Sequence, residues 1–240
     1  LPASLTVPAG KNSFAVSFTP DGVSAKLANV IITGSTNGSD SGAASLNVLT
    51  ASLISIGYVP SSIVGGNAAP CVVKLNGAAG PGGKSINLTS NSAFTVVPAT
   101  IIVPAQSHAV SFSATTKGVD ATLSTTTGAS AIGVNLFAGL QLKQAYALNA
   151  LPASPNVTGG QPVMVTIRLT GFAGPSGTKF TLTSNNAHAI VPASATVLQD
   201  HNAVAFMVQT TGVSLNTGAT ITCTGPGAVG TVQAVITVTK

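Results

Sequence analysis

Val97-Pro-Ala-Thr-Ile-Ile-Val103 and Val191-Pro-Ala-Ser-Ala-Thr-Val197 are two copies of one segment, and Leu1-Pro-Ala-Ser-Leu-Thr-Val7 is a third. Their prolines, at positions 2, 98 and 192, lie 96 and 94 residues apart. A repeat of this length is close to the size of one small domain of two packed sheets, and it is much longer than the repeat of a solenoid. The chain is therefore predicted to be a tandem array of domains.

The repeat extends well beyond this one segment. The glycines at positions 22, 118 and 212 keep the two proline spacings, and the second and third copies match further toward the N-terminus at a constant offset of 94. These further matches are Gly65-Gly66 with Gly159-Gly160, Ala79-Gly-Pro-Gly-Gly83 with Ala173-Gly-Pro-Ser-Gly177, and Leu88-Thr-Ser-Asn91 with Leu182-Thr-Ser-Asn185. The unit that repeats is thus a whole domain.

Apolar residues in each repeat alternate with polar or small ones, which is the pattern of strands with one buried face. The clearest sets are Cys71, Val73 and Leu75; Val165, Ile167 and Leu169; Val110, Phe112 and Ala114; Val204, Phe206 and Val208; and Phe14, Val16 and Phe18. Turns rich in Gly and Pro separate such runs. We expect an all-β fold of about seven short strands per domain, packed as a sandwich around one apolar core. Phe14, Phe112 and Phe206 are predicted to be buried at nearly equivalent places.

Residues 51–138 and 139–240 are predicted to form two complete domains, whereas residues 1–50 match only the later half of one. Half a sandwich leaves the inner faces of its strands, such as 13–19 and 27–33, uncovered. Either the sequence belongs to a longer array, or another chain supplies the missing strands. The junctions, expected at 49–53 and 137–142, are short and apolar, which predicts stiff stacking of domains.

The composition argues against several classes of function. Only 5% of the residues are charged, there is no Glu, and the eight Lys and the single Arg168 are scattered. A nucleic-acid surface needs concentrated positive charge, so no nucleic acid is expected as a partner. No apolar run approaches the ~20 residues of a membrane span, so no span is expected, and the first residues do not have the basic-then-apolar pattern of a signal segment.

Residues for catalysis or metal binding are scarce. No Gly-x-Ser-x-Gly elbow leads from a strand into a helix, and the four acidic residues, Asp21, Asp40, Asp120 and Asp200, form no pair for acid–base chemistry or calcium. His188 stands where the second copy has Phe94, which predicts a half-buried packing position. His188, Asp200 and His201 are the one candidate metal group, but neither they nor His108 recur between copies. No catalytic, cofactor-binding or metal-binding residue is therefore predicted, and the chain is not expected to be an enzyme.

The two cysteines fall in different predicted domains. Cys71 aligns with Val165, and Cys223 aligns roughly with Thr125. A bridge within one domain is therefore impossible, and we predict two unbonded thiols that act as small core residues.

Sugar binding is the main alternative to a purely structural role. A pyranose ring stacks on exposed aromatic faces, yet the chain has no Trp and only Tyr58 and Tyr146 as tyrosines, both near predicted domain entrances where packing at a junction is the simpler role. Asn37, Asn87 and Asn156 match the N-glycosylation pattern, which matters only if the source glycosylates.

The order Gly-Gly-x-x-Val, Leu-x-Gly-x-Ala-Gly-Pro, Leu-Thr-Ser-Asn and Val-Pro-Ala-Ser-x-Thr-Val resembles the tandem immunoglobulin-like repeats of large bacterial secreted and cell-surface proteins. The resemblance covers nearly the whole chain and rests on turn and strand-edge residues. It implies immunoglobulin-like sandwiches outside the cell or on its surface, with no cofactor. We therefore expect a structural block of an extracellular fibre, matrix or surface layer that associates with copies of itself; the alternative is an adhesin stalk or a module that binds a cell-surface glycan.

Overall fold

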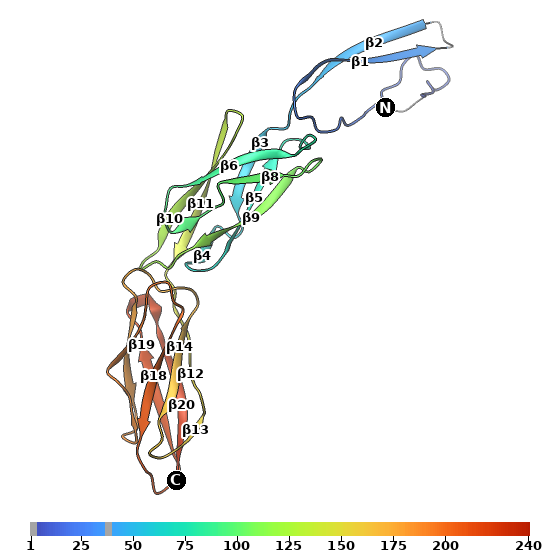
Figure 1. Cartoon of the computed structure of the whole chain (residues 1–240). Helices are drawn as coiled ribbons and strands as arrows, with labels where there is room; N and C mark the ends of the chain where they lie inside the picture. The colour runs from blue at the N-terminus through green and yellow to red at the C-terminus, as the bar shows by residue number, and fades with distance from the viewer. Residues whose placement is uncertain (1–3, 37–39) are drawn as a thin grey trace.

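The computed structural model describes residues 4–36 and 40–240. The chain runs as an extended series of β-structures from its N-terminal part to its C-terminal part (Figure 1). Apart from one short 3-10 helix, η1 (Gly227–Val229), the regular elements of the described residues are strands. The prediction of an all-β fold built of immunoglobulin-like sandwiches is confirmed, but each complete domain has nine strands, in sheets of four and five, where about seven were expected.

The second domain is a sandwich of two sheets. One sheet has the strand order β3-β5-β9-β7 and the other β4-β11-β10-β6-β8. The first sheet consists of β3 (Leu53–Tyr58), β5 (Ala69–Leu75), β7 (Thr95–Val96) and β9 (Ala109–Thr116). The second consists of β4 (Ser62–Val64), β6 (Lys84–Ser90), β8 (Thr100–Val103), β10 (Leu123–Ala131) and β11 (Val134–Lys143).

The third domain repeats this topology strand for strand, with sheet orders β12-β14-β18-β16 and β13-β20-β19-β15-β17. Its first sheet consists of β12 (Ala147–Pro152), β14 (Val163–Leu169), β16 (Ala189–Ile190) and β18 (Ala203–Thr210). Its second consists of β13 (Asn156–Thr158), β15 (Thr178–Ser184), β17 (Ser194–Val197), β19 (Thr217–Thr224) and β20 (Thr231–Thr239). The two domains therefore share one structural plan.

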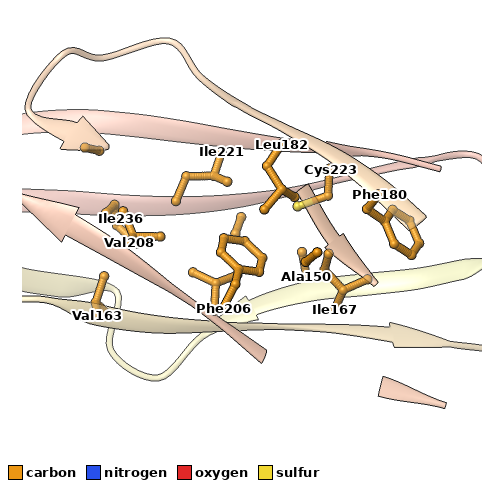
Figure 2. Close-up of a cluster of buried hydrophobic side chains, with 14 of the residues drawn as sticks. Ala150, Val163, Ile167, Phe180, Leu182, Phe206, Val208, Ile221, Cys223 and Ile236 are labelled. Carbon is orange, nitrogen blue, oxygen red and sulfur yellow. The ribbon is translucent and has the colours of Figure 1, made fainter. Parts of the chain in front are cut away.

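The period-two pattern creates the core of each sandwich. β5 and β14 show the same alternation of buried and exposed residues. The cross-strand pair Cys71–Phe112 of the second domain recurs as Val165–Phe206 in the third. Figure 2 shows apolar side chains from both sheets of the third domain, among them Phe206 and Leu182, meeting in its interior. Phe206 is buried and Phe112 is half-buried, in line with the sequence prediction.

The N-terminal part departs from the prediction. It forms one antiparallel hairpin, β1 (Leu27–Thr36) with β2 (Asp40–Val48). Residues 13–19 form no strand, and Phe14 is 55% exposed instead of buried. Alternation alone cannot make a strand, because a strand also needs a partner for its backbone and a facing sheet for its side chains. Among the described residues of this part, residues 13–19 have no partner strand and no facing sheet.

The boundary predicted between residues 138 and 139 falls inside β11. This strand pairs with β10 as far as Leu142, and Ala138, Leu140 and Leu142 are buried in the second domain. The buried alternation thus continues through the stretch expected to be a junction. The connection to the third domain is the short segment 144–146.

Candidate functional site

The most distinctive site of the chain is the joint between the second and third domains. The loop after β9, at Gly118, lies against the turn between β14 and β15, at Phe172–Ala173. Gly118 is buried, and a Cβ atom added to it would overlap the backbone carbonyls of Phe172 and Ala173. The two domains therefore meet backbone to backbone, which only glycine permits at this position.

A carboxylate fixes the edge of this contact. Asp120, two residues after Gly118, accepts a hydrogen bond from the Ser176 hydroxyl (2.9 Å, Oγ to Oδ2). The Ser176 backbone N–H also donates to both carboxylate oxygens, at 3.3 and 3.2 Å. Gly174 packs closely on Asp120, because an added Cβ would overlap its Oδ1 atom. The Asp120 carboxylate thus links the second domain to the third through Ser176.

A second contact lies beside the first. The Phe172 N–H donates to the Gly65 carbonyl (2.9 Å), and the Asn67 side-chain amide donates to the Thr170 carbonyl (3.0 Å). A Cβ at Gly66 would overlap Phe172, and Val64 packs against the core of the third domain. Two loops of one domain therefore hold one turn of the next.

The same contact occurs between the N-terminal part and the second domain. A Cβ at Gly22 would overlap the carbonyls of Ala78 and Ala79. The Ser24 hydroxyl donates to the Pro81 carbonyl (2.6 Å), and the Gly22 N–H donates to Gln106 Oε1 (3.2 Å). Ser24 and Asp120 are 96 residues apart, as are Gly22 and Gly118. Equivalent positions thus build two joints.

The receiving turn is held rigidly by its own domain. Ala173 donates its N–H to the His201 carbonyl (2.8 Å) and accepts from the Asp200 N–H (3.1 Å). Ala79 makes the corresponding pair of bonds with Ser107 and Gln106, at 2.9 and 2.8 Å. Since each turn is fixed within its domain, docking orders little additional backbone.

The three histidines lie at the surface. His188 is exposed, contrary to the prediction of a half-buried packing position, and its Nδ1 lies 2.7 Å from Thr211 Oγ1. A polar partner at the surface suits imidazole better than the apolar site that Phe94 occupies. Within residues 4–36 and 40–240, no three His, Cys, Asp or Glu side chains are grouped as metal ligands, and His108 and His201 are exposed.

Both cysteines are buried and unbonded, as predicted. Burial raises the pKa of each thiol to about 11. The alignment of Cys223 with Thr125 is wrong: Cys223 pairs with Leu182 as Ala129 pairs with Leu88, so Cys223 and Ala129 are equivalent. Both thiols are therefore packed in the cores, Cys223 at the place of Ala129 and Cys71 at the place of Val165.

The tyrosines differ from one another. Tyr58 is buried within the second domain, where its hydroxyl bonds Thr127 Oγ1 at 2.6 Å, and burial raises its pKa. It offers no face to a sugar. Tyr146 is 51% exposed in the 144–146 connection.

Of the three asparagines that match the N-glycosylation pattern, Asn87 and Asn156 are exposed, and Asn37 lies outside the described residues.

The sequence did not reveal the joints as contacts. It marked Gly118 and the turn at 173–177 as repeated positions, but a repeat says nothing about which of its positions face each other. The sequence feature that could have indicated the joints is the glycine at each of positions 22, 80, 118 and 174, where the two backbones approach each other.

In the described part of the chain, no helix has the length and apolarity needed to cross a membrane.

No protein-family model and no curated protein matches the chain. Solved structures similar to it include the D0–D1 domain of intimin, with 9% identity and a TM-score of 0.33 over 78% of this chain and 99% of that one. The Yersinia pseudotuberculosis adhesin InvE has 12% identity and a TM-score of 0.35, over 77% of this chain and 58% of that one. The I67–I69 fragment of titin has 10% identity and a TM-score of 0.30, over 85% and 71%. With similarity this low, none of these likenesses supports a conclusion about function.

Proposed function

We propose that the chain is a stiff structural rod of tandem immunoglobulin-like domains that serves as a building block of an extracellular fibre, matrix or surface layer. The observation that carries this proposal is the repeated joint. A flexible linker would leave room between domains, whereas here Gly22 and Gly118 each lie directly against the backbone of the next domain. Two joints of the same design in one chain favour a role in which each domain is held at a fixed angle to the next, as in a stiff rod.

The surface composition supports a role in assembled material. Only 5% of the residues are charged, and a net charge of +5 is spread over all 240 residues, so the repulsion per unit of rod length between neighbouring rods is low. Large apolar side chains are exposed along the N-terminal part, namely Leu5, Val7, Phe14, Phe18, Leu27, Ile31 and Leu49. A surface of this kind suits contact with other protein. The scarcity of Lys and Arg also leaves few sites for trypsin-like proteases.

The rod is tested by single-particle imaging of the purified chain beside Gly118→Val. The wild-type chain should show a narrow distribution of angles between the second and third domains. Gly118→Val should broaden it, because valine cannot fit against the Ala173 carbonyl. The matched control is Gly139→Val in β11, where an added Cβ has open space and the position is exposed. A wild-type distribution as broad as that of Gly118→Val would contradict the proposal.

Assembly is tested separately, by imaging the native material. A building block should occur in ordered filaments or layers in which rods touch through strand edges or domain ends. Rods that stay single and project from a surface would instead identify the chain as a stalk.

A further inference from the structure

The end of the third domain that lies away from the second domain carries the same loops that form the joint in the second domain. In the third domain, no described part of the chain is docked against these loops. Gly212 is equivalent to Gly118, and Gly160 is equivalent to Gly66, each at the offset of 94. Added Cβ atoms at Gly118 and Gly66 would overlap the next domain, whereas at Gly212 and Gly160 they would meet nothing within 4 Å. Gly212 is also exposed, whereas Gly118 is buried.

The polar groups of the joint are also present at this end. Ser214 stands where Ser24 and Asp120 stand, two residues after the glycine. Gln161 replaces Asn67 and offers the same side-chain amide donor. Gly159 lies close to Gly212, since its added Cβ would approach Gly212 Cα at 2.8 Å, just as Gly65 lies close to Gly118. The two loops therefore keep their mutual arrangement.

We propose that the surface formed by Gly159–Gln161 and Gly212–Ser214 is a docking site for the Gly-x-Ala-Gly-Pro-x-Gly turn of a further immunoglobulin-like domain attached in line after β20. Both occupied joints receive this turn, at 77–83 and at 171–177. The Ser214 hydroxyl would donate to the proline carbonyl of the incoming turn, as Ser24 donates to Pro81. The inference rests on the proposed rod function and extends it to a third joint.

The occupant is a domain in line and not a second copy of the chain. In each copy, both turns of the required sequence already hold a loop, one at Gly22 and the other at Gly118. A second copy would have to open one of its own joints to supply a turn. A domain attached in line brings a turn of its own.

The test is an extended protein in which a copy of residues 145–240 follows Lys240. This places the appended Ala173 57 residues after Gly212, the same spacing as from Gly22 to Ala79. In a segmentally labelled sample, hydrogen exchange is measured at two amides: the original Phe172, which bonds the Gly65 carbonyl, and its appended copy, which should bond Gly159. We expect comparable protection of both.

Gly212→Val in the extended protein should accelerate exchange at the appended Phe172 amide at least about tenfold and leave the original amide unchanged. Gly139→Val is the control and should change neither. In the 240-residue chain, Gly212→Val should leave the thermal midpoint unchanged, because its Cβ position is open.

An appended amide that exchanges at the rate of an exposed one, with or without Gly212→Val, would overturn the docking proposal. If the original Phe172 amide is protected in that sample, the rod function stands without the third joint. If neither amide is protected, the rod function itself fails.

Discussion

Tyr58 and Thr127 form an isolated polar pair inside the second domain. Their oxygens lie 2.6 Å apart, and both side chains are buried. In the third domain the equivalent positions hold Pro152 and Ile221, at the offset of 94, so the fold accepts an apolar pair there. The hydrogen bond is therefore an optional feature of one domain.

We expect Tyr58→Phe to lower the free energy of unfolding of the second domain by about 1–3 kcal/mol, because it leaves the buried Thr127 hydroxyl without a partner. The double variant Tyr58→Phe/Thr127→Val should recover most of that loss. Urea denaturation, monitored by hydrogen exchange in the segments of the second domain, measures the free energy of unfolding of both variants. Equal losses in the single and double variants would show that packing, and not the polar pair, sets the cost.

The buried thiols predict how stability depends on pH. Each cysteine has a folded pKa of about 11 against an ordinary value of 9.0. Because the unfolded chain releases these protons first, the free energy of unfolding should be unaffected by them below pH 9 and fall as the pH rises toward about 11.

In the folded state, iodoacetamide at pH 8 should leave both thiols unmodified. Denaturant should expose them together with their domains, as mass spectrometry can show. Rapid labelling of native Cys71 or Cys223 would contradict their burial.

At the scale of elements, sequence patterns predicted strands well wherever a partner strand existed. Val165, Ile167 and Leu169 alternate and lie buried in β14. Phe14, Val16 and Phe18 alternate in the same way but form no strand. Alternation shows only that a segment is suited to a strand with one buried face. A partner strand and a facing sheet must be present before that strand can form.

The candidate site could be predicted only in part. Repetition at fixed offsets singled out Gly22, Gly118 and Gly212 as equivalent. It could not say that Gly118 faces Ala173, since that contact depends on the short 144–146 connection and on the angle between domains. Likewise, the match to Phe94 predicted that His188 would be half-buried. The imidazole instead lies exposed at this position and bonds the Thr211 hydroxyl.

The uncovered N-terminal hairpin predicts a difference between isolated and assembled chains. Hydrogen exchange over residues 13–33 should be fast in the isolated chain and slow in the native assembly. Added strands would pair with the backbone of residues 13–19 and with the edge of β1 that does not face β2, and would bury apolar area, at roughly 25 cal/mol per Å². Equal protection in both samples would show that this part is stable alone and would remove the motive for strand completion.

At the scale of the whole molecule, the joints depend little on charge. Their contacts are backbone groups, glycines, hydroxyls and the neutral side-chain amides of Asn67 and Gln106, and the one acid among them, Asp120, accepts from the neutral Ser176. Screening should therefore leave the rod unchanged. Small-angle scattering should give the same maximum dimension at about 10 mM and about 1 M salt. A dimension that shrinks as salt rises would mean that long-range repulsion extends the chain instead.

The parallel pairing of terminal strands has a mechanical consequence. In each complete domain the second strand, β4 or β13, runs parallel to the last strand, β11 or β20. Tension along the chain pulls the early strand toward one pole of the domain and the last strand toward the other. Since the two strands point the same way, this tension shears all their hydrogen bonds at once and does not unzip them singly. A chain of such domains would resist stretching far better than the equilibrium stability usual for folded domains would suggest.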